Sequence, residues 1–226
     1  MSRGRVKYKT LQQESSTGLQ IGDLLLPADQ VAETVDFRRI FGNDRPVEVE
    51  IGSGKGGFLV EAAQARPGHN FLGIEYMGKF AMYIADRAAR HGLTNIRVLS
   101  VDASHLFIHR VPPESIDVLH IYHPDPWPKK RHHKRRLFQP TFVDAAIRAL
   151  KPGAYWYIQT DHAEYFEVMK AVTLDRPELE PMDFAGPEAA ADSPVLQTNF
   201  AVRYGQGGES IYQLAFRKKS GRPHAE

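Results

Sequence analysis

From Pro46 onward, short apolar runs alternate with amphipathic segments, and this alternation constrains the fold more than any other feature of the chain. The apolar runs cover residues 47–51, 71–74 and 96–101, and the amphipathic segments between them cover residues 58–64 and 80–90. Runs of that length predict buried strands, and the intervening segments have the period of helices. The alternation therefore predicts an α/β fold with a mostly parallel sheet.

The alternation continues through the second half of the chain. We expect a strand at residues 116–122, a helix at about 137–150, a strand at 154–159 and a helix at about 163–174. Gly153 supplies a helix-ending signal. Residues 178–194, rich in Pro, Ala and acidic residues, are expected to form an irregular connection. Two last strands, near residues 195–203 and 210–216, are joined through the glycine-rich residues 205–208 and predict a C-terminal antiparallel hairpin.

The length of the chain favours one principal domain, because 226 residues with 42% hydrophobic content can bury a single sizeable core. Residues 1–45 mix basic, polar, Gly and Pro positions without a sustained period. We expect them to form a basic and polar arm that folds back on the domain or stays partly mobile. The domain itself is expected at residues 46–217, followed by a polar tail at residues 218–226.

The composition argues against secretion and membrane insertion. The chain has no cysteine, so it has no disulfide and no thiolate metal site. The first nine residues are basic without an apolar segment behind them, unlike a secretory signal, and no run approaches the ~18 apolar residues of a membrane span. We expect a cytoplasmic protein.

The positive charge of the chain is concentrated in one place. Residues 129–136 read Lys-Lys-Arg-His-His-Lys-Arg-Arg, which puts six Lys and Arg residues into eight positions of a chain whose net charge is only +2. The rest of the chain is therefore net negative. A focused basic segment predicts a phosphate-rich partner such as a nucleic acid, whereas binding to a membrane surface is the weaker interpretation.

A glycine-rich segment follows the first predicted strand. Gly52, Gly54 and Gly57 match the pattern G-x-G-x-x-G, between a strand and a helix, where such a segment lets a nucleotide-like ligand approach the backbone. A P-loop is excluded, because Lys55 is not followed by Ser or Thr.

Acidic residues around this segment indicate which cofactor it binds. Glu75 ends the second strand, where a carboxylate can accept hydrogen bonds from ribose hydroxyls, as in NAD enzymes. Glu50 precedes the glycines and Asp102 follows the third strand. S-adenosylmethionine carries two amino groups that need acceptors and has no pyrophosphate, so three acids suit it better than they suit NAD. NAD remains the alternative.

A constrained turn connects the strand at residues 116–122 to the basic segment. It reads Pro124-Asp125-Pro126-Trp127, and its prolines limit the conformations that Asp125 can adopt. The turn lies at the carboxyl end of a strand, where open α/β sheets bind ligands. Trp127 either stacks on a base or anchors the loop. The four histidines at 120, 123, 132 and 133 have no regular ligand spacing, so we expect no metal.

Together, the turn and the basic segment closely resemble the signature of the bacterial tRNA (guanine-N7-)-methyltransferases, and the resemblance extends over about residues 46–216. It implies a Rossmann-like, seven-stranded class I methyltransferase fold. It also implies S-adenosylmethionine as the methyl donor and a variable-loop guanosine of tRNA as the acceptor.

The resemblance also assigns roles to individual residues. It implies donor binding by the segment containing Gly52 and Gly54 and by the acids Glu50, Glu75, Asp102 and Asp125. Asp125 is also implied as the catalytic residue, and Lys129, Asp161 and Thr198 are implied to bind the substrate. We expect the RNA to be bound by the cations of the basic segment: Lys129, Lys130, Arg131, Lys134, Arg135 and Arg136.

Two positions depart from the family pattern. His123 stands where the family commonly has Phe, and Ala201 stands where it has an acid that is expected to bind guanine. Loss of that acid would cost on the order of 1–3 kcal/mol unless water or another acid replaces it. This departure motivates a second alternative, a non-catalytic RNA-binding relative.

Overall fold

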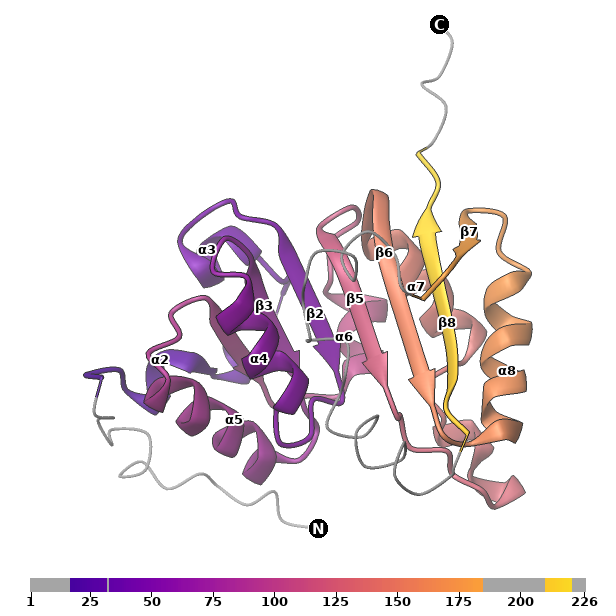
Figure 1. Ribbon diagram of the computed structural model, residues 1–226, viewed down its shortest axis with the longest axis horizontal. Coiled ribbons are helices and arrows are strands. Elements are labelled where there is room, and N and C mark those ends of the chain that lie inside the picture. The colour runs from indigo at the N-terminus through magenta and orange to yellow at the C-terminus, as the bar shows by residue number, and fades with distance from the viewer. Residues whose placement is uncertain (1–16, 32, 185–209, 221–226) are drawn as a thin grey trace, which may run out of the picture.

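The computed structural model describes residues 17–31, 33–184 and 210–220. Its centre is an eight-stranded sheet with the order β1-β4-β3-β2-β5-β6-β8-β7 (Figure 1). The strands are β1 (Leu25–Leu26), β2 (Val47–Ile51), β3 (Asn70–Ile74), β4 (Ile96–Leu99), β5 (Ile116–Tyr122), β6 (Leu150–Thr160), β7 (Leu179–Met182) and β8 (Tyr212–Lys218). Neighbours from β1 to β6 are parallel, and β8 is antiparallel to both β6 and β7. The predicted α/β sheet with C-terminal antiparallel strands is confirmed.

Helices cover both faces of this sheet. They are α2 (Ile21–Leu24), α3 (Phe37–Phe41), α4 (Gly57–Ala65), α5 (Gly78–Arg90), α6 (Ala103–His109), α7 (Pro140–Ala149) and α8 (Ala163–Leu174), with the 3-10 helices η1 (Ala28–Val31) and η2 (Lys130–Arg135). Apolar side chains of α2, α4 and α5 form one buried cluster against the sheet, and those of α3, α6, α7 and α8 form another. In Figure 1, α4 and α5 lie in front of the sheet and α6 and α7 behind it.

The helix α5 illustrates why the amphipathic segments fold as they do. Its buried residues recur at spacings of three and four, which places them on one face of a helix: Ala81, Ile84, Ala85, Ala88 and Ala89. On the exposed side, Asp86 and Arg90 form an i,i+4 ion pair at 2.8 Å. The sequence pattern and the local charges therefore favour the same structure.

The segment interpreted as an N-terminal arm folds back on the domain where the structure describes it. The strand β1 pairs with β4 and adds an edge to the seven strands that the resemblance implied. Leu24 and Phe41 are buried in the two clusters on opposite faces of the sheet. Residues 17–31 and 33–45 therefore contribute a strand and buried side chains to the fold.

The C-terminal antiparallel part of the sheet includes a strand that the sequence did not predict. Its strand β7, at Leu179–Met182, pairs with the side of β8 that faces away from β6 and lies inside the segment expected to be an irregular connection. Its Pro181 is compatible with a strand because β7 lies at the edge of the sheet, where one side needs no ladder hydrogen bond. The strand predicted near residues 195–203 lies outside the described residues.

The role predicted for Gly153 was also wrong. The helix α7 ends at Ala149, and Gly153 lies within β6 with φ = 81°. It occupies an irregularity between the pairs Ile116–Leu150 and Val118–Tyr155, where β6 carries extra residues. Glycine is suited to such a bulge because it adopts positive φ without steric cost.

Candidate active site

The glycine-rich loop between β2 and α4 exposes its backbone. Gly52 and Gly54 have φ = 78° and 53°, and a Cβ at Gly52 would find no atom of residues 17–31, 33–184 or 210–220 within 4 Å. A Cβ at Gly54 would meet only the carbonyl of Gly52, at 4.0 Å. The space above both residues is therefore open, and a ligand can approach their backbone closely.

The third glycine with a structural role in this loop is Gly56, which the sequence pattern missed in favour of Gly57. Gly56 has φ = 68° and precedes α4 as its N-cap. A Cβ on Gly56 would come within 2.9 Å of Ile84 of α5. Gly56 therefore allows close packing of the loop on α5, and the adjacent glycine pair was the signal that could have indicated it.

Glu50 carries a buried carboxylate oxygen that has no hydrogen-bond partner among the residues that the structure describes. The residue is 5% exposed, and no described residue bonds to its Oε2. Burial raises the pKa of Glu50 to about 8. The hydrogen bond of the Ser53 hydroxyl lowers this pKa, and the negative charge of Glu75 raises it. Such a group is costly in the folded protein, and it suits a ligand that supplies a hydrogen-bond donor or a positive charge.

Glu75, just past the end of β3, connects two loops. Its Oε2 accepts a hydrogen bond from the backbone N–H of Gly54 at 2.8 Å, and its Oε1 accepts one from the N–H of Met77 at 2.8 Å. A carboxylate has about four lone-pair sites, so Glu75 keeps capacity for ribose hydroxyls.

Asp102 lies farther along the same edge of the sheet. Its Oδ1 accepts a hydrogen bond from the N–H of His105 at 3.0 Å and caps α6, a helix that the sequence patterns did not predict. Since β4, β3, β2 and β5 are parallel neighbours, their carboxyl ends meet at one edge. That edge therefore carries Asp102, Glu75, Glu50 and the turn that begins after β5.

The turn after β5 holds Asp125 in an exposed position. Its ends contain two non-glycine residues in the left-handed region, His123 at φ = 49° and Trp127 at φ = 44°. Such positions are strained and concentrate at functional sites. The turn thus presents Asp125 to solvent from a backbone that its surroundings must hold in place.

His123, the first departure from the family pattern, fixes the start of this turn to β6. Its N–H donates to the carbonyl of Gln159 at 2.7 Å, and its Nε2 lies 2.8 Å from the Gln159 side-chain nitrogen. Its Nδ1 lies 3.5 Å from Asp161, which follows β6. Burial lowers the pKa of His123, although the Asp161 carboxylate raises it. The predicted substrate residue Asp161 therefore lies beside the turn.

The basic segment forms η2 and lies against Trp127. The guanidinium of Arg135 is 5.0 Å from the centre of the Trp127 ring, and His132 meets the ring edge-on at 5.8 Å. The cations exposed to solvent are Lys129, Lys130, Arg131, Lys134 and Arg135. Arg136, the last cation predicted to bind RNA, is only 4% exposed, and its guanidinium contacts protein groups.

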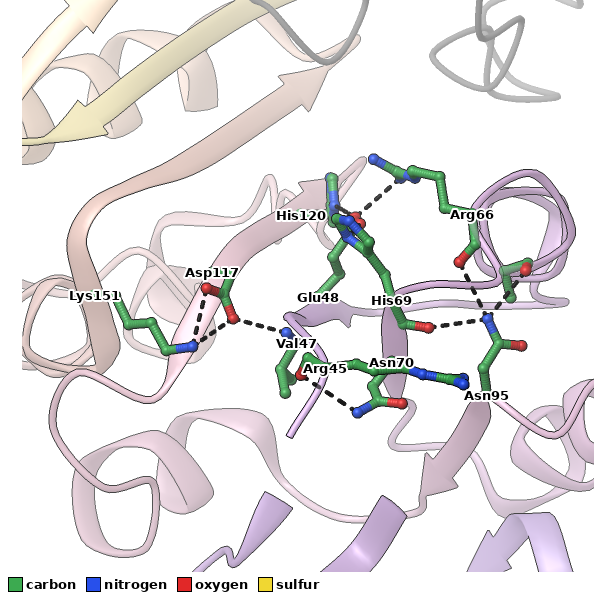
Figure 2. A network of polar contacts seen from close by, with 11 residues as sticks. Arg45, Val47, Glu48, Arg66, His69, Asn70, Asn95, Asp117, His120 and Lys151 are labelled. Carbon is green, nitrogen blue, oxygen red and sulfur yellow. Dashed lines mark hydrogen bonds and ion pairs between the residues drawn. The ribbon is translucent and has the colours of Figure 1, made fainter. Parts of the chain in front are cut away.

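A buried polar network lies on the same face of β2 as Glu50, two residues earlier in the strand. Glu48 is fully buried, accepts hydrogen bonds from His69 at 2.8 Å and His120 at 2.9 Å, and forms an ion pair with Arg66 at 2.9 Å (Figure 2). His120 also contacts the hydroxyl of Tyr122 at 2.9 Å. Burial would raise the pKa of Glu48, but the hydrogen bonds from His120 and His69 and the charge of Arg66 lower it to about 2.

Comparison with known proteins gives the family. A family model described as "Putative methyltransferase" matches residues 44–216. The chain is 40% identical over 185 residues to the tRNA (guanine-N(7)-)-methyltransferase of Burkholderia vietnamiensis, covering 82% of this chain and 72% of that protein. The chain belongs to the tRNA (guanine-N7-)-methyltransferase family. The predicted family is therefore confirmed.

Other comparisons agree on family and fold. The tRNA (guanine-N(7)-)-methyltransferase of Rhodopirellula baltica is 34% identical over 209 residues, covering 89% of this chain and 77% of that protein. The solved structure of the 16S rRNA methyltransferase KamB has a TM-score of 0.59 at 16% identity, covering 83% of this chain and 95% of that chain. The second likeness shows a shared methyltransferase fold. The remaining substrate residue predicted for the family, Thr198, lies outside the described residues, as does Ala201.

Proposed function

We propose that this tRNA (guanine-N7-)-methyltransferase family member transfers the methyl group of S-adenosylmethionine to N7 of a variable-loop guanosine in tRNA. The observation that carries the proposal is the placement of Glu50, Glu75, Asp102 and Asp125, which all lie at the carboxyl ends of adjacent strands. Ligands of open α/β sheets bind at this edge.

The residues on this edge fit the methyl donor. The unpartnered Glu50 oxygen, the open backbone at Gly52 and Gly54 and the remaining capacity of Glu75 supply acceptors and space for its amino and ribose groups. Asp102 offers a further carboxylate beside them. When bound, the donor supplies an electrophilic methyl group on a sulfonium sulfur.

The role proposed for Asp125 is electrostatic. Guanine N7 has a lone pair and no proton, so its methylation requires no base, and the enzyme's main task is to orient the reacting groups. The product purine is cationic. A carboxylate at Asp125, with Asp161 near the same turn, can accept hydrogen bonds from the guanine N1–H or amino group and stabilise the developing charge.

For the tRNA we propose binding by the exposed cations of the basic segment: Lys129, Lys130, Arg131, Lys134 and Arg135. Lys129 directly follows the turn and is proposed to meet a phosphate near the reacting base. Thr198 completes the proposed substrate residues.

The alternatives from the sequence now differ in strength. Membership of a methyltransferase family argues against an NAD-dependent oxidoreductase. The other alternative, a non-catalytic RNA-binding relative, is still supported by Ala201, which replaces the acid expected to bind guanine. We also propose a cytoplasmic location, since its relatives are named for action on tRNA; in the described ranges, every helix is too short or too polar to traverse a lipid bilayer.

The test is a transfer assay with unmodified tRNA and radiolabelled S-adenosylmethionine, followed by digestion of the RNA and identification of the labelled nucleoside. We expect label in N7-methylguanosine, and its loss in Asp125→Ala. Label in another nucleoside would keep the methyltransferase and reject the target. Bound tRNA with no transfer at saturating donor would favour the non-catalytic relative.

A further inference from the structure

The last cation of the basic segment points away from solvent. The guanidinium of Arg136 donates from Nε to the carbonyl of Pro126 at 2.8 Å and from both terminal nitrogens to the Glu164 carboxylate, one of them at 2.9 Å. It also lies 4.8 Å from the centre of the Tyr165 ring. Its donors are therefore directed at the protein, in the two-pronged geometry that arginine alone provides.

These contacts join two parts of the site. Pro126 belongs to the turn and directly follows Asp125, whereas Glu164 and Tyr165 lie in the first turn of α8. Tyr165 is itself fixed, because its hydroxyl accepts a hydrogen bond from the N–H of Phe138 at 3.2 Å. Arg136 thus ties the backbone next to Asp125 to a packed helix.

The turn needs such support on both sides of Asp125. His123 and Trp127 occupy strained left-handed conformations that persist only where the surroundings impose them. On the first side, His123 is held by the carbonyl of Gln159. On the second side, the Pro126 carbonyl is held by Arg136.

We propose that Arg136, Glu164 and Tyr165 form a brace that positions Asp125 for methyl transfer, and that Arg136 is a positioning residue and not an RNA contact. This inference rests on the proposed role of Asp125. The brace acts through orientation, so it affects turnover more than tRNA affinity.

Arg136→Lys tests the brace because it keeps the positive charge but removes the two-pronged guanidinium group. A single ammonium group cannot hold both Pro126 and Glu164 in the same geometry. We expect kcat to fall about 10- to 100-fold, the loss typical of a displaced reacting group, with the KM for tRNA within about twofold of wild type. Arg176→Lys is the matched control, since Arg176 donates to Asp144 at 2.8 Å away from the turn; its kcat should be unchanged.

A contrasting variant, Lys134→Ala, removes an exposed cation from the 3-10 helix η2, which directly precedes Arg136. It should raise the KM for tRNA most at low salt, and its difference from wild type should shrink as salt increases, because one phosphate contact fewer reduces the salt dependence. If Arg136→Lys gives that pattern with kcat preserved, Arg136 is an RNA contact and the proposal is rejected. If it lowers only the melting temperature, with both kinetic constants preserved, its role is purely structural and the proposal is also rejected.

A conformational readout separates this proposal from the proposed function. The chain has two tryptophans: Trp156 is fully buried, and Trp127 is partly exposed beside the turn. Acrylamide quenching therefore reports mainly on Trp127, and we expect it to increase in Arg136→Lys and in Glu164→Gln but not in Arg176→Lys. If wild type transfers no methyl group to tRNA, the proposed function fails, and quenching alone decides: unchanged quenching in Arg136→Lys overturns the brace.

Discussion

Glu75 accepts a hydrogen bond from the backbone N–H of Gly54 at 2.8 Å, so the acid that follows β3 holds the glycine loop that follows β2. Its second oxygen holds the N–H of Met77 at 2.8 Å. One ionised side chain thus fixes two loops of the proposed donor site. A carboxylate can do this because both of its oxygens are acceptors, whereas an amide has only one.

Glu75→Gln should therefore loosen the donor site. One of the two loop N–H groups would face the amide nitrogen, and we expect the Kd of S-adenosylhomocysteine to rise at least ~10-fold, about 1.4 kcal/mol. Isothermal titration calorimetry measures this change. Glu61→Gln is the control, because Glu61 lies on α4 in a partly exposed 3.9 Å ion pair with Arg87. Equal affinities for both variants would contradict the role of Glu75.

Donor binding should release a proton from Glu50. Burial raises the pKa of Glu50 to about 8, so the side chain is largely protonated at pH 7. A cationic amino group near its carboxylate would favour the ionised form. Calorimetry at pH 7 in buffers of different ionisation enthalpy should show release of nearly one proton per S-adenosylhomocysteine, and none for Glu50→Gln. The same release from the variant would assign the proton to another group.

The same residue should make the unliganded protein less stable at alkaline pH. The folded pKa of about 8 exceeds the ordinary glutamate pKa of 4.5, so the stabilisation by Glu50 is present below pH 4.5 and lost as pH rises through 8. We expect Glu50→Gln to unfold at a higher melting temperature than wild type at pH 8.5, with a gain in unfolding free energy of up to ~5 kcal/mol and weaker donor binding. A lower melting temperature at that pH would contradict the burial of an unpaired carboxylate.

The sheet and its site-bearing edge were predictable from sequence because buried strands appear as apolar runs and ligand sites follow their carboxyl ends. Less regular elements were not. The strand β7 contains Pro181 and two exposed residues, so its pattern does not differ from that of a loop. It forms a strand because β8 pairs with it, a contact made far along the chain.

The direction of individual side chains was likewise hidden from the sequence. Six cations in eight residues look alike, yet Arg136 turns inward because Glu164, 28 residues later, lies within reach. Glu48 and Glu50 also look alike in the strand, but Glu48 contacts His69, His120 and Arg66, whereas one Glu50 oxygen has no hydrogen-bond partner in the described part of the chain. Tertiary partners, not local pattern, separate structural charges from functional ones.

Glu48 should stabilise the fold and lose that effect in acid. Its folded pKa of about 2 lies below the ordinary glutamate pKa of 4.5, so its contribution to stability is present above pH 4.5 and lost as pH falls through 2. The difference corresponds to ~3 kcal/mol. Urea unfolding at pH 7 should show that Glu48→Gln lowers the free energy of unfolding by at least that amount. The reason is that Arg66 and the two histidines would lose the carboxylate that they contact. Asp86→Asn, which breaks an exposed pair, should cost below ~1 kcal/mol.

Removal of exposed cations should weaken tRNA binding through its salt dependence. Lys130 and Lys134 are exposed on η2, and each phosphate they neutralise releases condensed counterions. We expect the double variant Lys130→Ala/Lys134→Ala to reduce the slope of log Kobs against log salt by roughly 1–2 relative to wild type. Filter binding of unmodified tRNA at several salt concentrations measures the slope. The control Lys170→Ala removes an exposed cation from α8 and should leave the slope unchanged. Equal slopes for wild type and the double variant would mean that the RNA binds to a different surface. The basic segment would then only support the turn, through the contacts of its side chains with Pro126 and Trp127.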